Sequence, residues 1–368
     1  MKTKAAVVWK MNDPWEIVEL DLDEPQAGEL LVRFVATGLC HSDEHLRIGS
    51  VLPRYPMVGG HEGGGIVEAV GPGVTDFEVG DHVVTSFMPS CGKCASCRTG
   101  HPNLCELGAL LMQGTLPSGG FRFHGRSQDI GGMCLLGTFS EHAVISEHSA
   151  VKVDSDIPLD VACLVGCGVP TGWGSAVNVA DVRPGDTVVV YGVGGVGMNA
   201  VQGAHQAGAL RVVAVDPVPD KQEWARDFGA THTFGTAAEA HDLVVNATRG
   251  QMARSAILTI GHVQKEDVQA AVAVVGKNGR VVLTGQSHVL EKNVEVEGFS
   301  LLGYERQIIG TTFGSCRPHV DIPRLLEMYR EGAYKLDELI THRYTLEQIN
   351  EAYEAQARGE LIRGVIEF

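Results

Sequence analysis

The chain has 368 residues, enough for roughly two domains, and its composition of 44 % hydrophobic and 20 % charged residues is typical of a globular protein. Its formal net charge of −16 disfavours nucleic-acid and anionic-membrane partners, because neither is attracted to an acidic surface. We find no cleavage-type leader and no run of about 18 apolar residues, so no membrane span is expected. Nine cysteines, an odd number, favour a reducing cytoplasm over a disulfide framework.

The first part of the chain is predicted to form strands broken by turns, with a strand rich in β-forming side chains at residues 29–36. Two glycine-rich segments carry its polar residues. Residues 38–45 read Gly-Leu-Cys-His-Ser-Asp-Glu-His, and residues 58–65 read Val-Gly-Gly-His-Glu-Gly-Gly-Gly. So many glycines indicate a backbone that packs closely against something or adopts positive φ at several positions. Residues 80–84 are predicted to form a turn that leads into a further strand.

Four cysteines then follow at C-x2-C-x2-C-x7-C spacing: Cys91, Cys94, Cys97 and Cys105. Thiolates are soft ligands, and four of them can close a tetrahedral zinc shell at roughly 2.3 Å per Zn–S bond. Clustering within so few residues disfavours four unrelated buried thiols, although an iron–sulfur cluster also fits such a ligand set. A closed shell leaves no open coordination position, so this metal is expected to be structural.

The segment after the cysteines completes the first domain. Residues 106–136 are irregular in pattern and rich in glycine, which predicts an ordered loop. Strands resume over residues 138–145, and a helix is expected to begin near Pro170. These features place a first domain at residues 1–169.

The pattern changes to alternating strands and helices after this point. A helix is predicted from the glycine-rich turn at 192–197 to about residue 207, and another over residues 265–275. The predicted strands are residues 187–191, 211–215, 243–246, 256–260 and 280–284. Such βαβ periodicity predicts a second domain at residues 170–312, built on a parallel, doubly wound sheet.

The C-terminal part, residues 313–368, is predicted to complete the first domain. It carries two amphipathic helices, near 320–331 and 345–358, and a strand at 364–368 that is expected to return to the first domain.

A dinucleotide site is predicted where the first strand of the second domain meets its helix. The sequence G-x-G-x-x-G alone is a weak signal, but here it follows a strand, opens a helix and precedes an acidic residue at the end of the next strand. Gly192 makes the turn, Gly194 lets the backbone approach a pyrophosphate, and Gly197 allows close packing of helix on strand. Asp216 lies 24 residues after Gly192 and can accept from the ribose hydroxyls, which favours NAD over NADP. A glycine-rich turn of another α/β protein is the alternative.

A second metal site is suggested by Cys40, His61 and Cys167, each embedded in glycines. Two thiolates, one imidazole and an open position make a catalytic zinc shell. Each residue taken alone is more typical of a buried core side chain, so spacing by itself leaves both interpretations open. The remaining cysteines are interpreted as small buried hydrophobes: Cys134, Cys163 and Cys316.

Together, these motifs resemble those of the zinc-dependent medium-chain alcohol dehydrogenases, in the family's order and spacing over nearly the whole chain. The resemblance implies a GroES-like, β-rich catalytic domain and a Rossmann domain. Residues around Met112, Phe121 and Phe313 look most similar to actinobacterial members that are assayed with an artificial nitroso acceptor. Those members are nicotinoproteins, which hold NAD tightly and recycle it in place.

The resemblance also implies roles for individual residues. Cys40, His61 and Cys167 bind catalytic zinc, and Glu62 lies behind the metal and visits it transiently. Asp43 orients His61, as such carboxylates do. Further implied roles are alcohol binding by Ser42, proton transfer to solvent by His45 and lining of the substrate pocket by Phe87. The implied cofactor-binding residues are His41, Thr171, Gly192, Gly194, Gly195, Val196, Gly197, Asp216, Lys221 and Arg363.

Two positions depart from the family's usual pattern. His41 stands where an arginine is often found, so its grip on a cofactor phosphate is expected to be weaker or pH-dependent. Gln286 stands where an apolar residue is frequent, and we assign it no function.

The expected activity is hydride transfer between a primary alcohol or aldehyde and tightly bound NAD, with two zinc ions per chain. The expected partners are a small-molecule substrate, a second copy in a homodimer or homotetramer, and a redox partner or artificial acceptor. A formaldehyde dehydrogenase acting on a thiol adduct is the first alternative. A zinc- and NAD-binding redox sensor is disfavoured by the Ser42–His45 relay, and a zinc-independent reductase by the three metal ligands.

Overall fold

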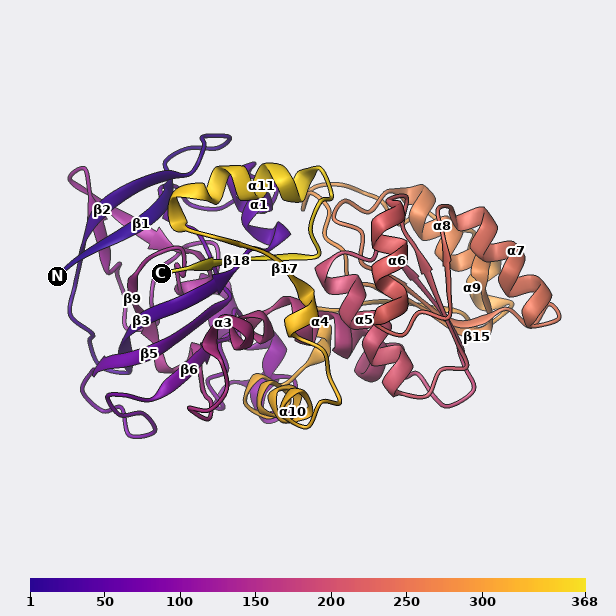
Figure 1. Cartoon of the computed structure of the whole chain (residues 1–368), viewed down its shortest axis with the longest axis horizontal. Helices are drawn as coiled ribbons and strands as arrows, with labels where there is room; N and C mark the ends of the chain where they lie inside the picture. The colour runs from indigo at the N-terminus through magenta and orange to yellow at the C-terminus, as the bar shows by residue number, and fades with distance from the viewer. The chain divides into compact units, whose positions relative to one another are not determined.

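The computed structural model describes all residues, 1–368, and divides into two compact units (Figure 1). The first unit comprises Met1–Cys167 and Arg317–Phe368, and the second comprises Gly168–Cys316. No helix has the length and apolar character needed to cross a membrane. Each unit has its own sheet system, so each is described by itself.

The first unit is rich in β-structure. A closed barrel contains, in order, β1 (Lys2–Val8), β2 (Glu16–Leu22), β7 (Phe123–Gly125), β8 (Gln128–Gly132) and β4 (Met57–Val58). A seven-stranded sheet contains β10 (Ala150–Lys152), β6 (His82–Thr85), β5 (Gly63–Val70), β3 (Glu29–Gly38), β18 (Arg363–Glu367) and β17 (Ile340–Tyr344), with β9 (His142–Ser146) paired to β3. The helices are α1 (His41–Arg47), α2 (Ala95–Arg98), α3 (Leu159–Ala162), α10 (Pro318–Arg330) and α11 (Ile349–Ala357).

Strand β3 is the centre of this sheet. It pairs antiparallel with β5, β9 and β18, and no residue along it is exposed. Its run of Leu, Val and Phe therefore suits a strand that is covered on both faces. The pairing of Val365 with Gly38 confirms that the C-terminal strand returns to the first domain, as the sequence predicted.

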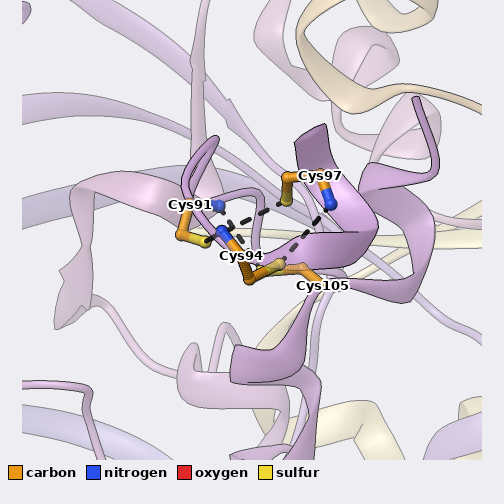
Figure 2. Close-up of side chains that lie close together, drawn as sticks. All are labelled: Cys91, Cys94, Cys97 and Cys105. Carbon is orange, nitrogen blue, oxygen red and sulfur yellow. Dashed lines mark hydrogen bonds between the residues drawn. The ribbon is translucent and has the colours of Figure 1, made fainter. Parts of the chain in front are cut away.

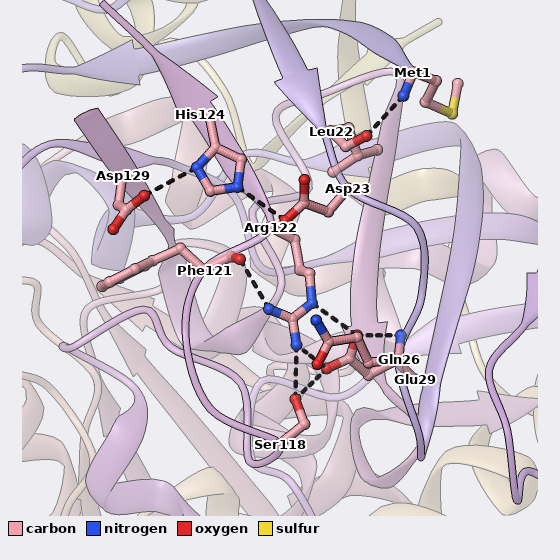
Figure 3. A network of polar contacts seen from close by, with 10 residues as sticks. All are labelled: Met1, Leu22, Asp23, Gln26, Glu29, Ser118, Phe121, Arg122, His124 and Asp129. Carbon is pink, nitrogen blue, oxygen red and sulfur yellow. Dashed lines mark hydrogen bonds and ion pairs between the residues drawn. The ribbon is translucent and has the colours of Figure 1, made fainter. Parts of the chain in front are cut away.

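A buried ion pair fastens the segment before β7 to the start of β3 (Figure 3). The Arg122 guanidinium donates to both carboxylate oxygens of Glu29, at 2.9 and 2.7 Å, and both side chains are buried. The Ser118 hydroxyl and the Gln26 backbone N–H also donate to Glu29. These contacts satisfy two charges that would be costly to bury alone, so this segment is ordered by tertiary contacts.

The second unit contains a six-stranded parallel sheet. Its strands, in spatial order, are β13 (His232–Phe234), β12 (Arg211–Val215), β11 (Thr187–Tyr191), β14 (Ala253–Leu258), β15 (Val275–Leu283) and β16 (Gln307–Gly310). Chain order within this unit is thus third, second, first, fourth, fifth, sixth, which is the doubly wound order of dinucleotide-binding folds. The predicted fold class is confirmed. The helices are α4 (Gly168–Gly174), α5 (Gly195–Gln206), α6 (Pro219–Asp227), α7 (Ala237–Ala247), α8 (Lys265–Val274) and α9 (Gly298–Leu302).

The predicted strand at residues 243–246 is wrong, because this apolar run lies inside α7. Thr236 and Glu239 form a capping box that starts the helix. Ala240 and Val244, four residues apart, are its buried positions, which is a helical spacing. The capping signal therefore outweighs the β-propensity of two adjacent valines.

The predicted irregular loop at residues 106–136 is also only partly correct, since it contains the antiparallel hairpin β7–β8. The hairpin turns at Arg126 and Ser127, which have φ of 50° and 59°. Turns with two positive φ angles usually contain Asn-Gly or Asp-Gly. Because this turn has neither, the sequence carries no signal for the hairpin.

Candidate metal and cofactor sites

The four clustered cysteines converge on one point in the first unit (Figure 2). The Sγ atoms of Cys91 and Cys97 are 4.0 Å apart, as are those of Cys94 and Cys105. A tetrahedral zinc shell with bonds of roughly 2.3 Å has sulfurs about 3.8 Å apart, so the observed spacing fits zinc. Gly92 and Gly100 have φ of 68° and 87°, and they turn the chain between the ligands.

Backbone amides around this cluster favour ionised sulfur. The N–H groups of Lys93 and Cys94 donate to Cys91 Sγ, and that of Cys97 donates to Cys94 Sγ. Backbone hydrogen bonds lower the pKa of Cys94 to about 6, whereas burial raises the pKa of Cys105 to about 12. Four such close thiols cannot all ionise without a cation, so the ligand set suits a divalent metal.

A second cluster brings together Cys40, His61, Glu62 and Cys167, which are far apart in sequence and all buried. One ligand atom from each lies within 4.8 Å of the others. Cys40 is the N-cap residue of α1, and His61 and Glu62 precede β5. The structure thus assembles the three predicted zinc ligands, and it places Glu62 beside them.

The His61 ring is held with one nitrogen directed at a carboxylate. Its Nδ1 lies 3.2 Å from Asp43 Oδ1, which also accepts the backbone N–H of Gly60 at 2.8 Å. His61 Nε2 is buried and has no hydrogen-bond partner. A buried polar atom without a partner is costly, and a metal ion on Nε2 would satisfy it. The donor set therefore fits a zinc ion.

The hydrogen bond between the Cys40 and Cys167 thiols shifts their pKa values in opposite directions. A hydrogen bond from Cys167, together with the charges of His61 and Arg363, lowers the pKa of Cys40 well below its usual value despite burial. The same contact, together with burial, raises the pKa of Cys167. The two neighbouring thiols thus share one proton. A metal cation that displaced this proton would find two thiolates able to bind it.

The glycines around this cluster permit close approach, as the sequence predicted. Gly60 has φ of 85°, and a Cβ there would lie 2.5 Å from the backbone nitrogen of Phe139. A Cβ on Gly59 would lie 2.4 Å from the Trp15 ring. Trp15 also contacts the Phe139 ring edge-on at 5.5 Å. The aromatic core thus packs directly on the segment that delivers His61.

The other predicted catalytic residues lie near this cluster. Ser42 Oγ is 3.6 Å from Cys40 Sγ, and His45 is buried one turn further along α1. The His45 ring contacts His41 edge-on, with centroids 4.9 Å apart. The Phe87 ring lies 6.0 Å from the His61 ring. Their roles in catalysis and substrate binding stay predictions.

The glycine motif of the second unit forms the turn between β11 and α5. Gly192 has φ of 81°, and a Cβ on Gly197 would lie 2.0 Å from the Gly192 carbonyl oxygen. Gly194 is the N-cap of α5, and the space around its missing Cβ is open. Free N–H groups at the first turn of a helix are a ready anion site. Gly195 and Val196 belong to this first turn.

Asp216 follows β12 and is buried at the same turn. Its Oδ2 accepts the Val193 backbone N–H and its Oδ1 accepts that of Val218, both at 3.0 Å. The carboxylate thus ties together the two loops at the carboxyl ends of β11 and β12. Thr171 lies in α4 and Lys221 in α6. The cofactor contacts of Thr171 and Lys221 stay predictions.

Sequence reasoning missed two contacts of the metal cluster. Arg363, expected at a cofactor phosphate, is buried with its guanidinium on Glu62. The Tyr353 hydroxyl donates to the Cys40 carbonyl oxygen at 3.2 Å. Both residues come from the C-terminal part of the first unit, and no local motif marks either of them. The phosphate contacts of Arg363 and His41 stay predictions.

Comparison with family models decides the affiliation. Residues 26–155 match the alcohol dehydrogenase GroES-like domain, and residues 195–331 match the zinc-binding dehydrogenase domain. The chain belongs to the zinc-dependent medium-chain alcohol dehydrogenase family. This confirms the resemblance drawn from the cysteine and glycine motifs.

Individual relatives in this family match the chain over nearly the full length of both sequences. An NDMA-dependent alcohol dehydrogenase of Amycolatopsis methanolica is 54 % identical over 366 residues, which cover 100 % of this chain and 99 % of that one. Alcohol dehydrogenase B of Mycobacterium tuberculosis is 47 % identical over 370 residues, with coverage of 100 % and 99 %. The expected likeness to nitroso-acceptor-dependent actinobacterial enzymes is thus confirmed.

Solved structures of the family share this architecture. Benzyl alcohol dehydrogenase of Acinetobacter calcoaceticus superposes with a TM-score of 0.93 at 31 % identity, over 100 % of this chain and 99 % of that one. An alcohol dehydrogenase zinc-binding domain protein of Burkholderia ambifaria gives 0.93 at 32 % identity, with the same coverage.

Replacing one of the four clustered cysteines tests the structural metal. We expect Cys94→Ala to lose one zinc per chain and to lower the free energy of unfolding by roughly 3 kcal/mol or more, because an incomplete shell no longer joins its segments. Metal analysis and denaturant unfolding measure both effects. Ser96→Ala, in the same short helix, is the matched control and should keep both properties. Unchanged stability and full metal content in Cys94→Ala would contradict a structural zinc.

Proposed function

We propose that the chain transfers a hydride between a primary alcohol or aldehyde and NAD, at a catalytic zinc held by Cys40, His61 and Cys167. The observation that carries the proposal is the buried cluster of two thiols and an imidazole whose Nε2 has no hydrogen-bond partner. We infer that the first unit is the catalytic domain and the second the dinucleotide-binding domain. The four-cysteine cluster would hold a second, structural zinc.

The residues around the cluster supply the remaining chemistry. Bound zinc supplies a Lewis acid that lowers the pKa of an alcohol toward neutrality. Ser42 would accept the hydrogen bond of the substrate hydroxyl, and His45 would carry its proton toward solvent. Asp43 keeps Nδ1 of His61 occupied, so Nε2 would be left to bind the metal. Phe87 supplies an apolar wall beside His61.

The second unit supports NAD as the hydride acceptor. Gly194 and Gly195 present the start of α5 to a pyrophosphate. The negative charge of Asp216 at the end of β12 would repel a 2′-phosphate, which favours NAD over NADP. Similarity to an NDMA-dependent enzyme supports a cofactor that stays bound and is recycled in place by a redox partner or an artificial acceptor. A cytoplasmic location stays a prediction.

We also propose that the chain assembles into a homodimer or homotetramer through the second unit. Leu290, Phe299 and Leu302 are each 70 % exposed or more, and they fall close together in sequence. They precede β16, which forms one edge of the sheet and contains no charged residue or proline. Such an unprotected edge, next to exposed apolar side chains, is a surface that proteins usually cover.

Removal of one proposed ligand tests the catalytic zinc. We expect Cys40→Ala to lose one zinc per chain and at least about a thousandfold in turnover, since a Lewis acid contributes several kcal/mol to the transition state. Metal analysis and steady-state kinetics measure both. Cys163→Ala removes a buried thiol outside the cluster and should keep two zinc ions. A Cys40→Ala protein that stays active without this zinc would refute the assignment.

The state of the cofactor is tested on the purified wild-type protein. We expect about one nicotinamide per chain to survive gel filtration, detected by its absorbance, and turnover with a nitroso acceptor to need no added NAD. Cofactor-free protein that requires added NAD would contradict tight binding and leave the zinc assignment standing. Faster turnover of a thiol–formaldehyde adduct than of free alcohols would favour the alternative activity.

Charge placed on the exposed apolar surface tests the assembly. We expect Leu302→Glu to shift the mass measured by light scattering toward the monomer, because a buried unpaired carboxylate disfavours the interface. Val79→Glu, at a position in the first unit that is 64 % exposed, is the control and should keep the wild-type mass. A monomeric wild-type protein, or an unchanged mass in Leu302→Glu, would contradict the proposal.

A further inference from the structure

The short helix that follows the proposed metal ligand Cys40 has no side-chain cap at its start. Helix α1 has seven residues, and Ser42, Asp43 and His45 all lie on it. Cys40 is its N-cap residue, but the Cys40 side chain makes no capping hydrogen bond. A helix this short is marginally stable by itself, and the absence of a cap weakens it further. Contacts with the rest of the first unit must therefore hold the start of α1 in place.

Tyr353, in α11, supplies such a contact. Its hydroxyl donates to the Cys40 carbonyl oxygen at 3.2 Å, and the residue is buried. The same carbonyl oxygen accepts the Asp43 backbone N–H at 3.1 Å, within the first turn of α1. Tyr353 therefore binds the helix at the residue whose thiol belongs to the metal cluster.

The aromatic core fixes the position of this hydroxyl. The Tyr353 ring stacks on Trp15, with centroids 6.0 Å and planes 27° apart, and its centroid lies 6.3 Å from that of Phe139. One turn earlier in α11, Asn350 binds the Trp15 backbone in both directions. Its Oδ1 accepts the Trp15 N–H at 3.0 Å, and its Nδ2 donates to the Trp15 carbonyl oxygen at 2.9 Å. The Tyr353 hydroxyl is thus held by a ring and a helix that have little freedom to move.

The hydroxyl also lies near the carboxylate that contacts His61. Burial raises the pKa of Tyr353, and the charge of the neighbouring Asp43 raises it further. Asp43 Oδ1 accepts the Gly60 N–H and contacts His61 Nδ1, whereas its Oδ2 is buried and has no hydrogen-bond partner. Tyr353 is therefore next to one proposed ligand, Cys40, and next to the residue that orients another.

A second tyrosine binds the opposite end of the same helix. The Tyr55 hydroxyl donates to the Leu46 carbonyl oxygen at 2.6 Å, and Leu46 and Arg47 are the last residues of α1. Neither of these two residues belongs to the metal cluster. Tyr55 thus makes the same kind of hydrogen bond to α1 as Tyr353 does, but away from the proposed ligands.

We propose that Tyr353 is a positioning residue for the reaction: its hydroxyl fixes the start of α1 and so sets the placement of Cys40 and Asp43 at the metal. This inference rests on the proposed zinc site. A purely structural hydroxyl would contribute to stability alone. A positioning hydroxyl would also determine the geometry of the metal-bound thiolates and the rate of the chemical step.

The test compares Tyr353→Phe with Tyr55→Phe in cobalt-substituted holoenzyme. Each substitution removes one hydroxyl and keeps the ring, so residue 353 still stacks on Trp15. The thiolate-to-cobalt absorption bands report the geometry at the sulfur ligands without catalysis, and cobalt at the four-cysteine cluster contributes equally to all spectra. We expect a shifted band in Tyr353→Phe and the wild-type spectrum in Tyr55→Phe.

Steady-state kinetics of the zinc-loaded variants give a second readout. We expect kcat of Tyr353→Phe to fall about tenfold while KM stays within about threefold of wild type, because misplaced reacting groups slow the chemical step more than they weaken substrate binding.

Three outcomes would overturn the inference and leave the zinc site intact: a wild-type cobalt spectrum in Tyr353→Phe, an equal spectral shift in both variants, or a wild-type kcat in Tyr353→Phe. A wild-type protein that binds only one cobalt ion per chain would overturn the zinc proposal as well.

Discussion

The burial of several charged groups around Cys40 is the constraint on which the first unit depends. Two thiols, an imidazole, two carboxylates and a guanidinium lie in a region that excludes water. Each is stable there only because a neighbour compensates it: Asp43 faces His61, and Arg363 faces Glu62. The pairing of β3 with β5 and β18 brings together the segments that carry these partners.

Compensation of charge by neighbouring groups also stabilises the four-cysteine cluster, although the partners there are different. There the ligands come from a short segment, and backbone N–H groups support the sulfurs. Four equivalent donors would fill the coordination shell of a bound zinc ion, which would leave no position for chemistry. In the Cys40 cluster the Glu62 carboxylate is paired with the Arg363 guanidinium.

Local spacing determines how much could be read from the sequence. The thiol cluster and the glycine turn before α5 depend on residues near one another in the chain, so their patterns are visible directly. Cys40, His61 and Cys167 were found because each sits among glycines and because the order of motifs resembled a family. By contrast, the contact of Arg363 with Glu62 arises from strand pairing between the two ends of the first unit, and no residue near Arg363 signals it.

The two errors have different origins. Residues 243–246 were predicted as a strand from their valines, and the deciding feature was the Thr236 cap several residues earlier. The β7–β8 hairpin was missed because Arg126 and Ser127 adopt positive φ without the usual turn residues. Tertiary contacts such as the Arg122–Glu29 pair hold that region in place instead. Sequence patterns report local preference, and they fail where distant partners set the conformation.

The position of β18 in the chain has a consequence for biosynthesis. The first unit is interrupted by the second, so Arg363 leaves the ribosome only after all six parallel strands of the second unit have been made. Nascent domains fold in the order in which they emerge. The nucleotide-binding sheet is therefore complete while β3 still has an empty edge and Glu62 has not met its guanidinium. The ion pair between Arg363 and Glu62 can therefore form only after the second unit has been synthesised.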